Sequence, residues 1–225
     1  MNFTFSREQM MFKKEVLRFA KKEIVPRVQE HDLKGEFDFE SFRKMGDFGI
    51  LGLHFPEELG GGGADVVTTV LAGEALGEAG VDGGLTLAYG AHSFLCADTI
   101  FRHGTDAQRK HYIPKLAGGE WIGCMGLSEP DAGSDVASMS TTAKRQGDTY
   151  VLNGTKMWIT NGPIADVAVV YAKTDPDQQH AGISAFIIDK GTPGFSAGPP
   201  LIKMGVRTSK TSELVLNNCV IPADN

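Results

Sequence analysis

The sequence predicts an α+β fold in two domains: an all-helical N-terminal domain over residues 1–119 and an antiparallel β-barrel or sandwich over residues 120–225. Before about Gly118, apolar residues recur at the three- and four-residue spacing of helices. After Glu120 they alternate with polar residues, as strands do. Because helical and extended segments do not alternate along the chain, the pattern excludes a βαβ architecture. A chain of 225 residues can bury two separate cores.

Five helices are expected in the first domain. The first begins after Ser6, which forms a capping box with Gln9, and Pro26 should bend or end its last turns. The fifth begins at Thr105, where Gln108 completes a second capping box, and Pro114 with the following AGGE should close it. The three helices between them are expected over residues 38–49, 64–80 and 84–104, and the last of these is almost wholly apolar.

Strands are expected throughout the second domain. Two glycine dipeptides, Gly147-Asp148 and Asn153-Gly154, are typical of tight turns and predict hairpins within residues 140–160. Asn153 also begins a glycosylation sequon, NGT, but the turn is the better interpretation. Further strands are expected over residues 121–128, 166–173, 183–190 and 212–221, with Pro193, Pro199 and Pro200 in the connections.

The composition excludes several classes of protein. The net charge is −6, and no basic block of the kind that binds nucleic acid is present. The three cysteines are far apart and form no CxxC pair, so neither a disulfide scaffold nor a zinc site is expected. The histidines lack the spacing of metal ligands. No apolar run is long enough to span a membrane, and no signal core is recognisable. We expect a cytoplasmic protein.

Two other features have a simple structural interpretation as well as a functional one. The glycine run Gly60 to Gly63 does not fit a phosphate-binding GxGxxG pattern, so it is better explained as a flexible connection between helices. Tyr89, His92 and Ser93 lie in the otherwise apolar helix over residues 84–104. They either pack in the core with satisfied polar tips or line a ligand cavity.

Two segments of the β domain are candidates for binding a planar cofactor. The first, MGLSEPDAGSD at residues 125–135, offers backbone N–H groups that can bind anions or heterocycle carbonyls, and Gly133 permits close approach. The second, KMWITNG, places Trp158 and Thr160 on one face of a strand. A flat aromatic ring beside a hydroxyl is a plausible wall for a planar ligand. No local Ser/His/Asp set accompanies these segments.

These segments resemble the acyl-CoA dehydrogenase family. LSEPDAGSDVASM, YVLNGTKMWITNGPIADVAVVYAKT and MGVRTSKTSELVLNNCVIP are similar to the family's middle domain. FPEELGGGGAD and HGTDAQRKHYIPKLAGGEWIGCMGLSEP are similar to its helical N-terminal domain. The resemblance covers essentially the whole chain, and the motifs occur in the family's order. LAYGAHSFLC and WITNGPIADVAVVYAKT look most like the isovaleryl-CoA dehydrogenase branch.

The resemblance implies FAD as cofactor. In the family, backbone groups of the first segment meet the flavin pyrimidine ring, the threonine matching Thr160 bonds near flavin N5, and the tryptophan matching Trp158 lies beside the ring. Ser134 and Tyr89 are the candidate substrate-binding residues. Asp131 stands where many members have glycine and should point to solvent or cap a turn. The expected cofactor-binding residues are Met125, Gly126, Leu127, Ser128, Gly133, Ser134, Trp158, Ile159 and Thr160.

The implied reaction is α,β-dehydrogenation of a short- or branched-chain acyl-CoA thioester. A carboxylate takes the α-proton, the β-hydride passes to the flavin, and the electrons leave through an electron-transfer flavoprotein. The thioester carbonyl must be polarised for a glutamate to remove the proton.

In the family, a third, helical domain follows the β domain and supplies the catalytic glutamate, further FAD contacts and much of a tetramer interface. This chain stops at VIPADN, where that domain would begin. We therefore expect no catalytic residue here, an inactive chain, and weak FAD binding. Glu129 lies in the flavin segment but is not expected to be the base. Two alternatives are a flavin monooxygenase of the same fold and a non-catalytic two-domain interaction module.

Overall fold

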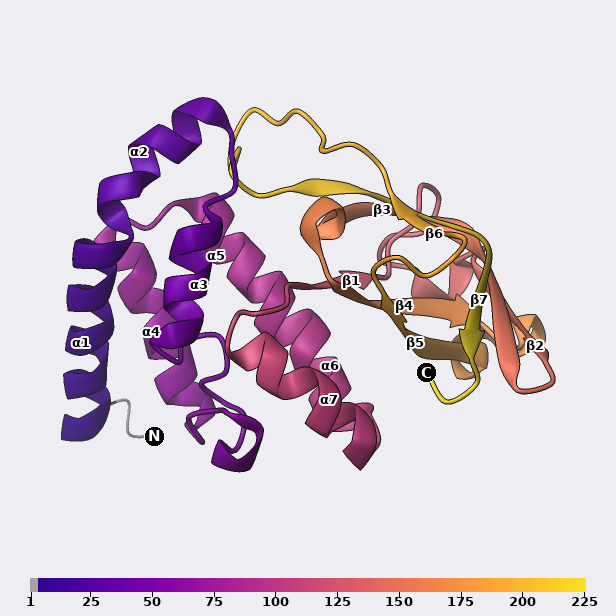
Figure 1. Cartoon of the computed structure of the whole chain (residues 1–225), viewed down its shortest axis with the longest axis horizontal. Coiled ribbons are helices and arrows are strands. Elements are labelled where there is room, and N and C mark those ends of the chain that lie inside the picture. The colour runs from indigo at the N-terminus through magenta and orange to yellow at the C-terminus, as the bar shows by residue number, and fades with distance from the viewer. Residues whose placement is uncertain (1–3) are drawn as a thin grey trace.

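The computed structural model describes residues 4–225 as a helical part and a sheet part lying side by side (Figure 1). Both capping boxes form, at Ser6 with Gln9 and at Thr105 with Gln108. The helices of the first part are α1 (Arg7–Glu23), α2 (Val25–Lys34), α3 (Phe39–Asp47), the 3-10 turn η1 (Glu57–Leu59), α4 (Val66–Ala79), α5 (Gly83–Gly90), the π-helical turn η2 (Ala91–Ala97), α6 (Asp98–His103) and α7 (Asp106–Ala117).

Two prolines of the helical part, Pro26 and Pro114, lie differently from expectation. The first helix ends at Glu23, and Pro26 lies in the first turn of α2, where its missing N–H is not needed. The fifth predicted helix, α7, continues through Pro114 to Ala117. It is therefore the glycines after Ala117, and not the proline, that end this helix.

The predicted helix over residues 84–104 is helical throughout but contains a π turn. It is built from α5, η2 and α6 in succession. The wider turn carries His92 and Ser93, both of which are fully buried. π turns within α-helices frequently lie at functional sites, and the periodicity of an apolar run does not reveal them.

One seven-stranded sheet forms the second part. Its order is β1-β4-β2-β3-β7-β6, with β5 paired to β4. Gly147-Asp148 turns between β2 and β3 as predicted. The strands are β1 (Gly123–Gly126), β2 (Thr142–Gln146), β3 (Thr149–Thr160), β4 (Val167–Lys173), β5 (Ile183–Asp189), β6 (Phe195–Ala197) and β7 (Thr211–Pro222), and the 3-10 turns are η3 (Val136–Ser138), η4 (Gly162–Ile164) and η5 (Pro176–Gly182).

The sheet is mixed, so the prediction of a purely antiparallel domain was wrong. β1 runs parallel to β4, with Gly123 opposite Val167, and β2 meets β4 in the parallel sense at Thr142 and Lys173. Along the chain, the β2–β3 hairpin comes between β1 and β4. This insertion allows β1 and β4 to run in the same direction. Alternating hydrophobicity is the same in either direction, so it could not give the strand direction.

Asn153-Gly154 is not a turn. Both residues lie inside β3, where the register against β7 shifts between Leu152 and Gly154. A side chain at position 154 would meet Thr141 Oγ1 at 2.3 Å, so close backbone approach requires this glycine. A glycine in a strand can mark a bulge as well as a turn, and the dipeptide alone does not separate the two.

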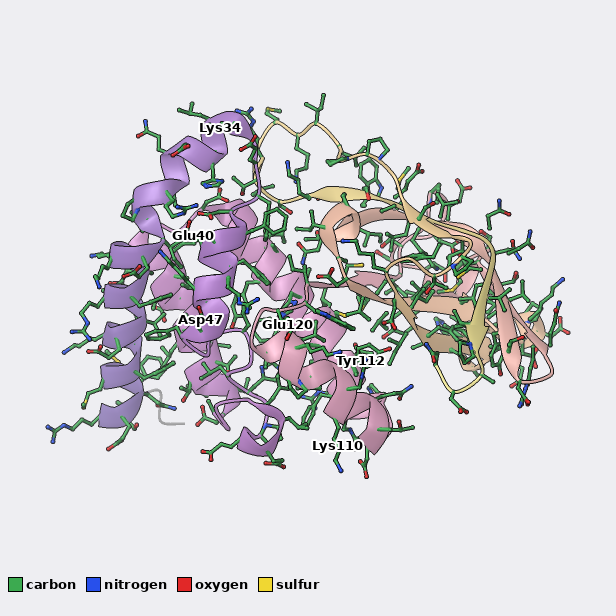
Figure 2. The ribbon with its side chains drawn as sticks, viewed as in Figure 1. Lys34, Glu40, Asp47, Lys110, Tyr112 and Glu120 are labelled. Atoms are coloured by element: carbon green, nitrogen blue, oxygen red, sulfur yellow. The ribbon has the colours of Figure 1, made fainter. Side chains whose placement is uncertain are left out.

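Apolar side chains from both parts pack at the junction between the helices and the sheet. Cys96, Ile100 and Leu116 from the helices contact Val167 and Ile187 from the sheet in one cluster. The loop before β7 also reaches back to the helical part (Figure 1), where Lys210 Nζ donates to Gly35 O at 2.6 Å. Lys34 marks the end of α2 nearest this loop (Figure 2). The two parts are therefore fixed relative to one another.

Candidate functional site

The two candidate segments lie against one another in the structure. The loop that follows β1 runs beside the far end of β3, and the Met157 N–H donates to Ser128 O at 2.8 Å. The Lys156 ammonium donates to Leu127 O at 3.2 Å. Segments that are separated along the chain thus form one local unit, as a shared ligand site requires.

A buried ion pair joins these segments. Lys156 is 0% exposed and Glu129 is 5% exposed, and Lys156 Nζ lies 2.8 Å from Glu129 Oε1. The same carboxylate accepts the Ser140 N–H at 2.6 Å, the Ser140 hydroxyl at 2.7 Å and the Thr141 N–H at 3.0 Å. All of its partners are donors, so the carboxylate is held in its ionised form.

Its pKa follows from that environment. Burial by itself would raise the pKa of Glu129, but the bonds from Lys156, Thr141 and Ser140 outweigh it and lower the pKa to about 2. Burial lowers the pKa of Lys156 in turn, while Glu129 acts to raise it. A buried carboxylate that accepts this many hydrogen bonds is a weak base toward a ligand.

Trp158 stands out from the end of β3. The register against β7 shifts between Lys156 and Ile159, and Trp158 in this bulge has a φ of 63°. It is 65% exposed, whereas Ile159 is buried and Thr160 is half-buried. A bulky residue in the left-handed region is strained, and strain of this kind concentrates at functional sites. The bulge leaves a large flat ring exposed to solvent near the end of β3.

Asn161 fixes the end of β3 to the helical part. It is fully buried, and its Nδ2 donates to Ala88 O at 2.9 Å and to Gly123 O at 3.1 Å. Its own φ is 67°, which asparagine tolerates better than most residues. The sequence interpretation missed Asn161, although an asparagine directly after a strand is a signal for a left-handed turn.

The other predicted cofactor-binding residues lie along the loop and β1. Met125 and Gly126 belong to β1, Leu127 and Ser128 are half-buried, and Gly133 and Ser134 are exposed. No atom lies within 4 Å of the position a side chain would take at Gly133, so a ligand could approach the backbone there. Asp131 is exposed, as expected.

Tyr89 combines a core position with an unsatisfied polar tip. It is 4% exposed, and its ring lies 5.2 Å from that of Phe94 in an edge-on contact. Burial raises the pKa of the phenol. Within residues 4–225 its hydroxyl has no hydrogen-bond partner. The ring therefore packs in the core, while the hydroxyl still lacks the partner expected of a purely structural tyrosine.

The polar side-chain atoms of His92 and Ser93 are all hydrogen-bonded, as packing in a core requires. The Gly123 N–H donates to His92 Nδ1 at 2.9 Å, and His92 Nε2 lies 3.0 Å from Leu116 O. Burial lowers the pKa of His92 to about 4, so the ring is neutral and Nε2 carries the proton. Ser93 Oγ donates to Leu51 O at 2.8 Å. Both residues therefore join separate elements of the structure by hydrogen bonds.

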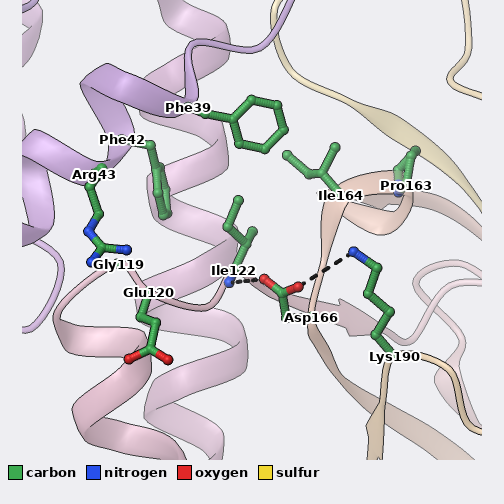
Figure 3. Close-up of a pocket in the computed structure, with 10 residues that line it drawn as sticks. All are labelled: Phe39, Phe42, Arg43, Gly119, Glu120, Ile122, Pro163, Ile164, Asp166 and Lys190. Atoms are coloured by element: carbon green, nitrogen blue, oxygen red, sulfur yellow. Dashed lines mark hydrogen bonds and ion pairs between the residues drawn. The ribbon is translucent and has the colours of Figure 1, made fainter.

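A cavity of about 500 Å³ opens at the junction of the two parts (Figure 3). Asp166 lies within it and accepts the Ile122 N–H at 3.0 Å, while Lys190 Nζ approaches its other oxygen at 3.5 Å. None of the predicted site residues lines this cavity. The cavity is therefore separate from the candidate site.

The described part of the chain holds no cluster of three or more His, Cys, Asp or Glu that could bind a metal ion. Between Thr4 and Asn225 no helix is both long and apolar enough to cross a membrane. Cys96, Cys124 and Cys219 are buried and unpaired.

The fold and this site define a protein with a helical domain docked on a curled mixed-sheet domain, whose exposed loop and aromatic strand end suit a planar cofactor. Residues 6–120 match the model of the acyl-CoA dehydrogenase N-terminal domain, and residues 124–219 match that of the middle domain. The chain belongs to the acyl-CoA dehydrogenase family, whose members are FAD-dependent flavoproteins.

Relatives include mitochondrial isovaleryl-CoA dehydrogenase of Pongo abelii, 45% identical over 98% of this chain and 52% of the relative. Among solved structures, butyryl-CoA dehydrogenase from Megasphaera elsdenii is 40% identical with a TM-score of 0.93, over 100% of this chain and 59% of that one. A chain described as electron transferring flavoprotein of Acidaminococcus fermentans is 44% identical with a TM-score of 0.95, over 100% and 59%. This chain thus spans little more than half the length of these proteins.

Proposed function

We propose that the chain contributes to FAD-dependent α,β-dehydrogenation of a short- or branched-chain acyl-CoA thioester, which yields the 2-enoyl-CoA. The observation that carries this proposal is the pair of hydrogen bonds that holds the loop at Leu127 and Ser128 against the end of β3 at Lys156 and Met157. The relatives named for isovaleryl-CoA and butyryl-CoA support the substrate class.

The residues of this unit fit a flavin. The Ser128 N–H has no protein acceptor within residues 4–225, and Gly133 leaves its backbone open. Trp158 offers an exposed ring, and half-buried Thr160 follows it two residues later at the end of β3. When bound, FAD supplies the hydride acceptor. We assign these residues, with Met125, Gly126, Leu127 and Ser134, to holding and orienting it.

We assign no catalytic base within the described residues. Glu129 is the only carboxylate of the loop that is buried against the candidate site, and it is committed to Lys156, Ser140 and Thr141. Asp131 and Asp135 are exposed. We therefore propose that the 225-residue chain alone binds FAD weakly and does not turn over substrate.

Substrate contacts are proposed for Ser134 and Tyr89. The unpartnered hydroxyl of Tyr89 supports a polar ligand nearby, and Ser134 is exposed on the loop. We further propose that the full-length protein is a homotetramer that passes electrons to an electron-transfer flavoprotein, and that it works in the reducing cytoplasm. Ile202 and Met204 are fully exposed apolar residues, which supports coverage by other protein surface.

A spectroscopic and a kinetic experiment test the proposal together. The purified chain, mixed with FAD and separated from free flavin, should retain flavin absorbance, but it should not reduce a dye with isovaleryl-CoA or butyryl-CoA. Rapid dye reduction would show that the base lies within this chain. Oxygen consumption with reduced flavin would favour a monooxygenase, and copurification of a partner without any flavin binding would favour an interaction module.

A further inference from the structure

We propose that Lys156 is a positioning residue for the flavin. Its ammonium orients and polarises the peptide bond between Leu127 and Ser128, and Glu129 holds the ammonium in place as its counter-charge. This inference rests on the proposed flavin site, because it concerns how that site's backbone donor is prepared.

The ammonium has no capacity left for a direct contact with a ligand. A lysine carries three N–H donors. Lys156 Nζ lies 3.2 Å from Leu127 O, 2.8 Å from Glu129 Oε1 and 3.9 Å from Met139 Sδ, and the side chain is 0% exposed. Any influence on a bound flavin must therefore pass through the groups that it touches, of which the Leu127 carbonyl belongs to the candidate site.

The direction of that influence follows from peptide geometry. No described peptide bond is cis, and in a trans peptide the N–H points opposite to the carbonyl. Since Leu127 O faces Lys156, the Ser128 N–H faces away from it. The next carbonyl, Ser128 O, accepts the Met157 N–H at 2.8 Å. Two consecutive carbonyls are thus fixed on β3, and the Ser128 N–H is directed outward without a protein acceptor.

The charge strengthens that donor. Hydrogen bonds to an ionised group are roughly twice as strong as neutral ones, and chains of hydrogen bonds polarise one another in a buried setting. The ammonium draws electron density toward Leu127 O, which leaves the Ser128 N–H a better donor to a heterocycle carbonyl or ring nitrogen. Glu129 keeps the ammonium in place because its other bonds tie it to the backbone at Ser140 and Thr141.

Three variants separate this role from a purely structural one: Lys156→Met, Glu129→Gln and the double variant E129Q/K156M. The matched control is Lys13→Met, which removes a lysine that pairs with Glu74 and Glu78 on the surface of the helical domain. Three quantities are measured on the 225-residue chain: the melting temperature without FAD, hydrogen exchange of the Met157 amide without FAD, and the dissociation constant for FAD.

Each single variant should lower the melting temperature, because it leaves one buried partner unpaired, and the double variant should recover most of that loss.

FAD affinity should follow a different pattern. Lys156→Met and the double variant should both raise the dissociation constant at least about tenfold, since a charge-assisted bond is lost. Glu129→Gln keeps Lys156 but removes its counter-charge, so it should raise the dissociation constant by less than Lys156→Met does. The Met157 amide should exchange faster in both variants that lack Lys156, and the control should change neither FAD affinity nor Met157 exchange.

Recovery of FAD affinity together with the melting temperature in the double variant would overturn the proposal, because the pair would then be only structural. Unchanged protection of Met157 without Lys156 would overturn it as well. A wild-type chain that bound no FAD would instead contradict the proposed function, and Met157 exchange would still decide whether Lys156 positions the loop.

Discussion

Two buried polar junctions of this molecule join different elements and use different kinds of hydrogen bond. At the candidate site, a charged pair, Lys156 and Glu129, holds the loop on β3. At the junction of the helices with the sheet, the neutral ring of His92 bridges Gly123 and Leu116. Both Lys156 and His92 are 0% exposed. The comparison suggests that charge is placed where a ligand needs a polarised donor, whereas neutral hydrogen bonds suffice to dock two apolar surfaces.

The largest effect on stability is expected from unpairing the charged junction. Glu129→Gln leaves the Lys156 ammonium buried without its counter-ion, and breaking a buried pair costs about 3–5 kcal/mol of unfolding free energy. Urea unfolding of the chain measures this cost. Lys13→Met, at an exposed pair, should cost at most about 1 kcal/mol. Equal losses in the two variants would show that burial of the charged junction does not matter.

The neutral junction should be the next most sensitive. His92→Ala leaves the Gly123 N–H and Leu116 O without partners and opens a cavity, so we expect a loss of about 2–4 kcal/mol. The same urea series measures it, with His180→Ala at an exposed position as control. A loss below that of the control would mean that apolar packing alone docks the two parts.

Acid should break the two junctions in separate pH windows. The pKa of His92 falls from its ordinary 6.5 to about 4 on folding, so the unfolded chain binds the extra proton and stability is lost as the pH falls from 6.5 toward 4. The pKa of Glu129 falls from 4.5 to about 2. Its contribution is present above 4.5 and is lost as the pH falls from there toward 2.

Unfolding free energies measured from pH 7 to pH 2 check both windows. In wild type, the unfolding free energy should fall by on the order of 3 kcal/mol across the upper window. His92→Ala should abolish most of that fall, and E129Q/K156M should abolish the fall across the lower window. A single steep transition that both variants leave unchanged would contradict the assignment of either window.

The smallest effect on stability is expected at Trp158, although its effect on the ligand should be large. Trp158→Asn removes a mostly exposed ring and places a residue that tolerates positive φ in the bulge, so unfolding free energy should change by less than about 1 kcal/mol. FAD affinity should nevertheless fall, as equilibrium dialysis can show. A variant that melts normally and binds FAD like wild type would remove Trp158 from the site.

The sequence correctly predicted those features that depend on residues close together in the chain. The capping boxes at Ser6 and Thr105 and the turn at Gly147-Asp148 are decided by residues a few positions apart, and all three are confirmed. The direction of β1 against β4 and the bulge at Gly154 depend on contacts with distant strands. No nearby residue specifies them, so the sequence interpretation missed both.

The candidate site was predictable in part for the same reason. The loop and the strand end were recognised from their composition and their resemblance to a family. What joins them was not recognised, because the burial of Lys156 depends on Glu129 and Leu127, 27 and 29 positions earlier in the chain. A lysine in a strand is ordinarily solvated, and only the tertiary structure shows that this one is not.

The central claim is that the loop at Ser128 and the strand end at Trp158 form one wall of a flavin site. The chain has two tryptophans, Trp121 and Trp158, so its indole N–H groups give two assignable signals in a ¹⁵N–¹H spectrum. On titration with FAD, we expect the Trp158 indole and the Ser128 amide to shift together and to saturate, while the Trp121 indole stays in place. Shifts confined to Trp121, or no shift of either Trp158 or Ser128 while FAD binds, would contradict the claim.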